Sequence, residues 1–397
     1  MGLTTIDLFA GAGGLTEGFR QADALCLYAN DADARAVATF RHNHPATWAE
    51  CRPIEDVDPG RVRRRLRMLR GDLDVLVGGP PCQGFSINAP GRFLDDTRNA
   101  LFRHYVRFLD EFEPRAFVLE NVPGMLSLAD GAIFEEIVGT LVARGYAVSA
   151  RVLFAAHYGV PQERWRLILL GSQHGLDHPE PAHAAAGRAN FRGARSMTLA
   201  AAEGLPAPVT VGEAIGDLPR LRAGEGAEEM AYGAAPASPY AAALRAGSPG
   251  VFNHVAGRLA AINQERLRHV GPGGSWRDIP FDLLPKGMQR ARRSDHTKRY
   301  GRLRTDGLGA TVMTKCDPHW GPVFLPDQDR ALTVREAARL QSFPDRFRFL
   351  GARVAQYEQV GNAVPPLMAR AIAAALADQL GPGRAEPELR LPLGAAA

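Results

Sequence analysis

The sequence predicts an α/β protein: an open, mostly parallel sheet with helices on both faces, together with a smaller irregular region. Two observations predict this fold class. In the first 171 residues, short runs rich in β-branched or aromatic residues alternate with stretches of helical periodicity, as in βαβ units. From residue 172 the chain becomes rich in alanine, glycine and proline, and strong periodicity returns only after residue 330.

Five runs of the first part are expected to be strands of this sheet. They are TTIDLFA (4–10), ALCLYA (24–29), DVLVGG (74–79), AFVLEN (116–121) and RLILLG (166–171). Between the third and the fourth run, Leu101, Tyr105, Phe108 and Phe112 form one helical stripe, which predicts a helix packed on the sheet. The run VPPLMARAIAAALADQL (364–380) predicts a second amphipathic helix that lies back on the first domain.

These patterns divide the chain into four parts. Residues 1–171 are expected to be the first part of a catalytic domain, and residues 172–329 a separate recognition domain. Residues 330–380 are expected to return and complete the catalytic domain, which is then discontinuous in sequence. Residues 381–397 have the composition of a disordered tail.

The composition is that of a globular protein with its thiols free. The formal net charge of the 397 residues is +4, which permits a polyanionic partner without requiring one. The four cysteines form no CxxC pair, so neither a metal site nor a disulfide framework is predicted. No run of eighteen apolar residues and no signal-like leader is seen, so we expect a cytoplasmic protein without a membrane partner.

A glycine turn follows the first predicted strand in DLFAGAGG, residues 7–14. Glycines at this place let the backbone approach a ligand closely. Asp31 lies at the end of the second predicted strand, where a carboxylate often accepts ribose hydroxyl protons. Thr16 replaces the third glycine of a dinucleotide fingerprint, so an adenosine cofactor without a diphosphate is favoured. A tight turn with an unrelated surface aspartate is the alternative on these two features alone.

A cysteine stands on a stiff turn in GGPPCQGFS, residues 78–86. A lone cysteine is more often an inert core residue, but Cys82 follows a parallel strand whose carboxyl end faces the ligand crevice. The next strand ends in ENVPG and brings Glu120 to the same edge, while QERWR supplies Arg164 and Arg166. A nucleophile, an acid and guanidinium groups at one edge predict a reaction site.

Six motifs in order resemble those of the DNA cytosine-5 methyltransferases of the bacterial restriction-modification type. They are DLFAGAGG, GGPPCQGFS, ENVPG, QERWRLILLG, LTVREAARLQSFP and QVGNAVPP. The resemblance covers about residues 4–171 and 330–380, and it implies the fold of the S-adenosylmethionine-dependent methyltransferases, Rossmann-like. It further implies that Cys82 adds covalently to a cytosine, that Glu120 holds the ring, and that Arg164 and Arg166 orient both.

The same resemblance implies S-adenosylmethionine as cofactor and assigns its contacts. The implied cofactor-binding residues are Phe9, Gly11, Gly13, Gly14, Asp31, Asp56, Val57, Pro81, Leu101, Asn362 and Val364. Two departures from the family's pattern bear on binding strength: many relatives carry glutamate in place of Asp31, and a larger residue in place of Ala32.

Double-stranded DNA is the substrate that the resemblance implies, with the target cytosine rotated out of the helix. The expected DNA-binding residues are Gln83 and Ser86 on the catalytic side, with Arg290, Arg292, Arg293, Lys298, Arg299, Arg302 and Arg304 in the recognition domain. A cognate restriction endonuclease is a partner that this setting allows, and one active site per chain suits a monomer in the bacterial cytoplasm or nucleoid. Two alternatives stay open: a tRNA cytosine-5 methyltransferase, and a catalytically silent DNA-binding relative.

Overall fold

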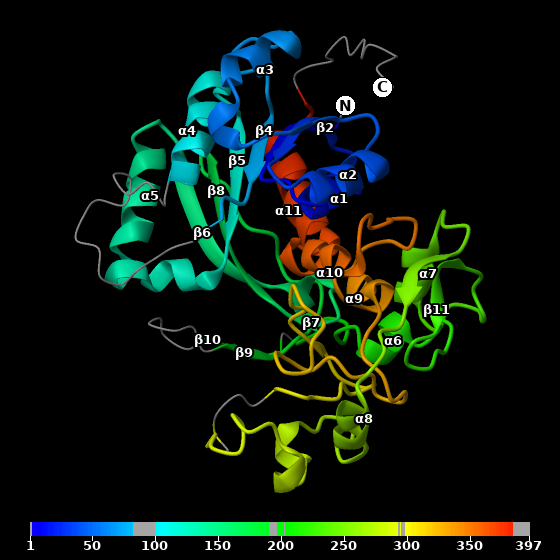
Figure 1. The fold of residues 1–397 in the computed structure, drawn as a ribbon. Coiled ribbons are helices and arrows are strands. Elements are labelled where there is room, and N and C mark those ends of the chain that lie inside the picture. Colours follow the sequence, from blue (N-terminus) through cyan, green and yellow to red (C-terminus); the bar gives the residue numbers. More distant parts are fainter. Residues whose placement is uncertain are drawn as a thin grey trace.

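The computed structural model describes residues 2–81, 100–189, 197–201, 203–292, 294 and 298–383. In these residues the central feature is a seven-stranded sheet (Figure 1). From one edge to the other its strands are β3 (Trp48–Cys51), β2 (Leu25–Asp31), β1 (Thr4–Leu8), β4 (Val75–Gly78), β5 (Ala116–Asn121), β8 (Trp165–Ser172) and β6 (Ala147–Phe154). The pairs from β3 to β5 are parallel, whereas β8 is antiparallel to both of its neighbours. The prediction of a mostly parallel sheet is therefore confirmed.

All five predicted strands belong to this sheet, and the structure adds β3 and β6 at its two edges. Their positions at the edges explain why the sequences of these two strands lack a clear strand pattern. The outer part of β6, from Ala147 to Arg151, is exposed or only half-buried, so it lacks the apolar run that marks an interior strand. In β4, by contrast, every residue is buried.

Helices cover both faces of the sheet, as predicted. On one face, α4 (Ala100–Phe112) buries the predicted stripe, with Tyr105, Phe108 and Phe112 fully buried and Leu101 half-buried against the same apolar cluster. The other helices next to the sheet are α1 (Gly14–Arg20), α2 (Ala34–Asn43), α3 (Pro59–Arg65), α5 (Ala132–Val142) and α11 (Pro366–Leu380). The cluster under α4 also takes side chains of α3 and α5, while α1 and α11 pack together on the opposite face.

The helix α11 returns from the end of the chain to the first strand–helix unit. Met368, Ile372 and Leu376 are buried in the same cluster as Leu15 and Phe19 of α1. A Cβ atom at Gly18 would lie 2.4 Å from the Pro366 carbonyl oxygen, so the two helices are in close contact there. The stretch Arg353–Leu380 is apolar and long enough to span a membrane by length and composition alone, but more than half of its most apolar part is buried in the protein. This makes it weak evidence for a membrane segment.

Residues 172–329, which we call the middle region, contain only short elements in their described part, as predicted. They are β9 (Gly187–Ala189), β10 (Met197–Leu199), α6 (Val211–Ile215), β11 (Gly226–Met230), α7 (Pro239–Arg245), β12 (Val251–Val255), α8 (Ala261–Arg268) and β13 (Gly309–Ala310). β9 pairs with β10, and β11 pairs with β12. β13 pairs with β7 (Gln162–Glu163), which directly precedes Arg164. The domain boundaries at 171/172 and 329/330 stay a prediction.

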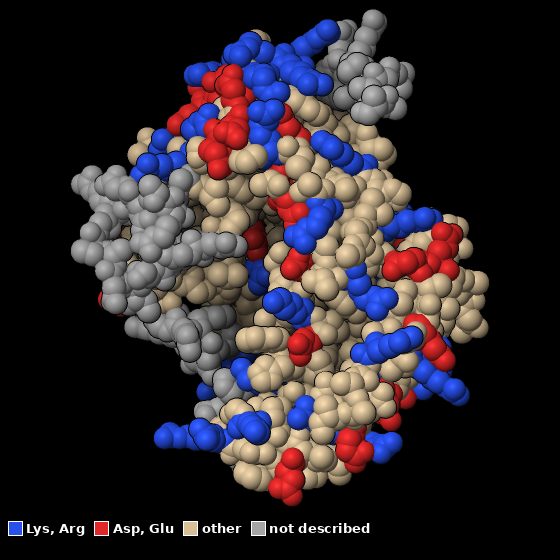
Figure 2. Space-filling view, viewed as in Figure 1, with Lys and Arg blue, Asp and Glu red and all other residues tan. Residues whose placement is uncertain are grey.

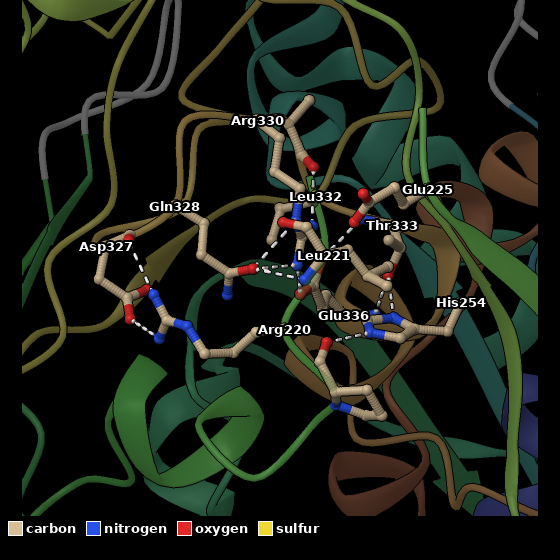
Figure 3. Close-up of polar contacts among 12 residues, drawn as sticks. Arg220, Leu221, Glu225, His254, Asp327, Gln328, Arg330, Leu332, Thr333 and Glu336 are labelled. Atoms are coloured by element: carbon tan, nitrogen blue, oxygen red, sulfur yellow. Dashed lines mark hydrogen bonds and ion pairs between the residues drawn. The ribbon is translucent and has the colours of Figure 1, made fainter. Parts of the chain in front are cut away.

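The middle region is attached to α9 (Val334–Leu340) through buried polar side chains (Figure 3). Arg330, the residue that follows the middle region, forms a two-pronged ion pair with Glu336 of α9 at 2.7 and 2.8 Å, and both side chains are buried. The Nε of Arg330 also donates to the Leu221 carbonyl of the middle region at 3.2 Å. Glu336 also accepts a hydrogen bond from the backbone N–H of Thr333, the N-cap of α9. The ring of His254 on β12 lies between the Thr333 hydroxyl and the Pro219 carbonyl, at 2.9 and 2.8 Å. The last long helix, α10 (Arg353–Asn362), leads from this joint to α11.

Candidate active site

A cavity of about 740 Å³ opens at the carboxyl ends of β1, β2, β4 and β5. This is the edge at which open α/β sheets bind their ligands. Figure 2 shows the surface hollowed near its centre, with acidic and basic side chains in the hollow. The lining residues come from separate parts of the chain: residues 9–12, 14 and 15, residues 30–33, 35 and 36, residues 53–55, residues 79–81, residue 101, residues 120–122, residue 166, and residues 358, 359 and 361–364.

The glycine turn after β1 forms one wall of the cavity. Gly11 and Gly13 have φ values of 56° and 98°, a left-handed path that glycine adopts without strain. Phe9, which precedes them, also has a positive φ, 58°. The Gly11 N–H donates to Asp31 Oδ2 at 2.8 Å, and the Asp33 N–H donates to Asp31 Oδ1 at 2.8 Å. Asp31 therefore braces the turn, and burial raises the pKa of its carboxyl. Each of its oxygens retains a lone pair for a further donor.

Most of the predicted cofactor-binding residues line the cavity, and three do not. Phe9, Gly11, Gly14, Asp31, Pro81, Leu101, Asn362 and Val364 are lining residues. Gly13 instead turns toward α2, where a Cβ atom would lie 2.9 Å from Phe40 and His44. Asp56 and Val57, two of the predicted cofactor-binding residues, are not among the lining residues. Ile54 and Glu55 line the cavity, because the short 3-10 turn Ile54–Asp56 directs Val57 into the core beneath α4.

The return segment after α10 closes the cavity against the glycine turn. A Cβ atom at Gly14 would lie 2.4 Å from the Val364 carbonyl oxygen, so only glycine permits this approach. Asn362 and Val364 thus reach the same cavity as Phe9 and Gly11, from the other end of the chain.

Glu120 and Arg166 form an ion pair in the cavity wall. Arg166 Nε lies 2.6 Å from Glu120 Oε1, and the two side chains are only 13% and 14% exposed. The backbone leading to Cys82 lies directly against them. A Cβ atom at Gly79 would lie 2.8 Å from Glu120 Oε2, and the Asn121 side-chain amide donates to the Pro80 carbonyl at 3.0 Å. Cys82, Gln83 and Ser86 themselves lie outside the described residues.

Arg164 occupies a different place from the one predicted. It is 1% exposed, and its guanidinium donates to the backbone carbonyls of Val312, Gly361 and Ala363 at 3.2, 2.8 and 3.0 Å. This corrects the prediction that both arginines hold Glu120, since the ion pair belongs to Arg166. Burial, with Arg166 nearby, lowers the pKa of Arg164.

The predicted DNA-binding charges of the middle region have unequal surroundings. Arg302 is only 8% exposed and donates to the carbonyls of Val270, Leu325 and Leu267, so the prediction that it faces DNA was wrong. The exposed charges are partly paired: Lys298 with Glu163, and Arg304 with Asp306 at 2.8 Å. Arg290 and Arg292 are exposed, and Arg293 lies outside the described residues.

Arg299 lies among aromatic side chains that the sequence analysis missed. Its guanidinium is 5.6 Å from the Trp320 ring centroid, and its Nη1 is 3.2 Å from His319 Nε2. Trp320 is 57% exposed, which is unusual for so large an apolar residue. A tryptophan flanked by turn residues in PHWGP, close in sequence to a basic segment, was the available signal.

Comparison with known proteins identifies relatives along nearly the whole chain. Residues 3–378 match the family model of the C-5 cytosine-specific DNA methylases. The chain is 37% identical to the Type II methyltransferase M.AgeI of Thalassovita gelatinovora, over 94% of this chain and 98% of the relative. It is 36% identical to the Type II methyltransferase M1.HphI of Haemophilus parahaemolyticus, over 95% of this chain and 87% of the relative. A solved structure described as a DNA modification methyltransferase encoded within a prophage (E. coli) has the same fold, with a TM-score of 0.73 at 24% identity over 96% of this chain and 100% of that one.

Proposed function

Because the chain belongs to the C-5 cytosine-specific DNA methylase family and is a DNA cytosine-5 methyltransferase of the restriction-modification type, we propose that it methylates a flipped-out cytosine through a covalent Cys82 adduct. The observation that carries this proposal is the ion pair of Glu120 and Arg166 against the backbone of Gly79 and Pro80. It supports a site in which the thiol and the carboxyl group reach the same ring.

The chemistry of these groups suits the reaction. C5 of cytosine is a poor nucleophile until the Cys82 thiolate bonds to C6, which shifts the ring electrons toward C5. Glu120 would hold N3 and the exocyclic amine of the ring while charge builds on it, and Arg166 would keep the carboxyl group in place. C5 would then bond to the methyl group as the sulfonium S–CH3 bond breaks, with S-adenosylhomocysteine as the leaving group. Loss of the C5 proton to water or hydroxide and cleavage of the S–C6 bond would restore the ring and free Cys82.

The cavity fits S-adenosylmethionine, which supplies an electrophilic methyl group when bound. Its volume of about 740 Å³ is in the range of small-molecule sites. Phe9, Ile54 and Leu101 offer an apolar wall for an adenine ring, and Asp31 keeps acceptor capacity for ribose hydroxyls. Asn362 and the Val364 backbone would hold the methionine part.

The middle region is proposed to bind double-stranded DNA. Its described candidates are Arg290, Arg292, Lys298, Arg299 and Arg304. Trp320 joins them as an exposed ring beside Arg299. Lys298 is paired with Glu163, which precedes the ion-paired Arg166 of the cavity wall by three residues, so this face adjoins the cavity wall. Arginine is suited to guanine edges in the major groove, whereas the other charges would serve phosphates. We place the enzyme in the bacterial cytoplasm or nucleoid, and its partner would be a cognate restriction endonuclease that acts on the same DNA site.

The experiment incubates the chain with methyl-labelled S-adenosylmethionine and either mixed-sequence duplex DNA or tRNA. Labelled 5-methylcytosine in DNA, together with a covalent complex on DNA that contains 5-fluorocytosine, is the expected result. Label in tRNA alone would assign the RNA substrate, and cofactor and DNA binding without transfer would assign the silent relative. Sequencing of bisulfite-treated product DNA then gives the target site.

A further inference from the structure

Three buried polar side chains join segments that are far apart in the sequence. Arg164 binds the carbonyls of Val312, Gly361 and Ala363, as described above. Gln162 and Gln341 complete the cluster, and neither has any exposed surface. We call these three residues the junction.

The two glutamines connect the same segments a second time. The Gln162 side chain accepts from the Val312 N–H at 2.8 Å and donates to the Leu340 carbonyl at 3.0 Å. It also donates to the Gln341 side-chain oxygen at 3.1 Å, and the Gln341 amide donates to the Val360 carbonyl at 2.7 Å. The two backbone segments that Arg164 binds are therefore each bound by a glutamine as well: Val312 by Gln162, and the segment that begins at Val360 by Gln341.

The joined segments belong to different parts of the proposed machinery. Gly361 and Ala363 line the cofactor cavity, whereas Val312 follows β13 in the middle region and precedes the exposed Trp320 by eight positions. The contact is close, since a Cβ atom at Gly361 would lie 2.5 Å from the carbonyl carbon of Met313. The junction thus lies between the cavity and the face proposed to bind DNA.

We propose that Arg164 is a positioning residue that, with Gln162 and Gln341, holds the cofactor-side backbone at Gly361–Ala363 and the middle region at Val312 in one fixed relation. This inference rests on the proposed function, and it goes beyond it by making cofactor affinity and DNA affinity depend on one buried side chain that touches neither ligand.

The physical reason is the cost of unsatisfied buried groups. A buried guanidinium that loses a carbonyl partner keeps a charged donor without water, and the abandoned carbonyl also goes unpaired. The backbone at Gly361–Ala363 therefore cannot shift independently of Val312. Because misplacing a binding group by about 1 Å can weaken catalysis by about 100-fold, this rigidity matters at the cavity.

The test measures the dissociation constants of S-adenosylhomocysteine and of duplex DNA for Arg164→Met, with Arg302→Met as the matched control. Both arginines are buried and donate to three backbone carbonyls, but the Arg302 partners all lie within the middle region. Arg164→Met should weaken S-adenosylhomocysteine binding by about tenfold or more, since hydrogen bonds from charged donors are lost, and should weaken DNA binding as well. Arg302→Met should weaken DNA binding alone, and Arg164→Lys should recover part of both affinities.

Gly361→Ala is a second variant that keeps the junction residues and forces the Met313 backbone away from the cavity. It should weaken the binding of both S-adenosylhomocysteine and duplex DNA, so the proposal stays testable even if Arg164→Met does not fold. Unchanged S-adenosylhomocysteine affinity in folded Arg164→Met or Gly361→Ala would overturn it, and so would an equal loss in Arg302→Met. Failure of the wild-type chain to bind S-adenosylhomocysteine would instead refute the proposed cofactor.

Discussion

The central sheet is packed on both faces by apolar side chains, whereas the middle region is fixed to α9 by buried charges. On the sheet, the strands and the helices α1, α4 and α11 share two large apolar clusters. Arg339 of α9 pairs with Asp217 of the middle region and with Asp345. Arg330, the residue that follows the middle region, pairs with Glu336 of α9, and all of these side chains are buried (Figure 3 shows Arg330 and Glu336).

This difference has a consequence for how each part tolerates change. Apolar contacts are non-directional, so a helix on the sheet can shift slightly and retain most of its burial. A buried ion pair has one satisfactory geometry, and removal of one partner leaves a charge without water or counter-ion. The orientation of the middle region therefore depends on a few residues, while the orientation of the sheet helices depends on many.

The largest effect is expected at the sheet edge. Cys82→Ser should lower the rate of methyl transfer on the order of 10⁴-fold or more, because a serine hydroxyl stays protonated where the thiol can ionise. DNA affinity should change little, since the middle region is untouched. Single-turnover transfer of labelled methyl groups and DNA binding measured by fluorescence anisotropy separate the two quantities. A serine variant with the wild-type rate would remove Cys82 from the mechanism.

Glu120→Gln tests the second group to which we assign a catalytic role. The amide cannot accept a proton or balance Arg166, so the rate of methyl transfer should fall roughly 10³-fold, within the range for general acid–base groups. Glu163→Gln is the matched control, because Glu163 pairs with Lys298 outside the cavity lining. A similar fall in the rate of methyl transfer in both variants would show that the rate depends on negative charge anywhere near residues 120 and 163, and not on the Glu120–Arg166 pair.

Arg339→Met breaks the joint of the middle region. Asp217 and Asp345 would keep buried charges, so the free energy of unfolding should fall by about 3–5 kcal/mol. Arg144→Met removes the ion pair of Arg144 with the half-exposed Asp110 and should cost less than about 1 kcal/mol. Urea unfolding of the two variants measures the contrast. Equal losses would mean that the middle region does not depend on its buried charges.

Asp7→Asn probes a buried charge beneath the glycine turn. Burial raises the pKa of Asp7 to about 7, and its Oδ1 has no hydrogen-bond partner among the described residues, although Oδ2 accepts from Thr16 at 2.6 Å. Because the folded pKa lies above the ordinary value, the wild type loses stability as the pH rises toward 7. Relative to the wild type, Asp7→Asn should therefore gain roughly 2–3 kcal/mol between pH 5 and pH 8.

The control for this pH dependence is Asp33→Asn. Arg35 holds the pKa of Asp33 below its ordinary value, so the wild type keeps that contribution at every pH above about 5. The difference in free energy of unfolding between Asp33→Asn and the wild type should therefore be constant between pH 5 and pH 8. A constant difference for Asp7→Asn as well would contradict the raised pKa of Asp7.

The positions of the proposed catalytic and cofactor-binding residues could be predicted from the sequence where a short motif directly follows a strand. Glu120 ends β5 and Phe9 and Gly11 follow β1, so the common edge of a parallel sheet brings them together whatever the loops do. Asp56 and Val57 lie outside the cavity lining because the 3-10 turn Ile54–Asp56 brings Ile54 and Glu55 to the cavity, and no pattern in the sequence indicates such a turn. Trp320 was not predicted because its proposed part in DNA binding depends on the exposure of its ring, which the sequence pattern does not indicate.

The sequence by itself determined the α/β class, five strands, the helix stripes and the family motifs, because apolar periodicity and strand ends are local properties. Only the tertiary structure decided which arginine holds Glu120. Arg164 and Arg166 are equivalent by sequence, yet one lies in the cavity wall and the other among backbone carbonyls of distant segments. The surroundings of a charge are set by what the rest of the chain brings to it, and spacing along the sequence does not encode that.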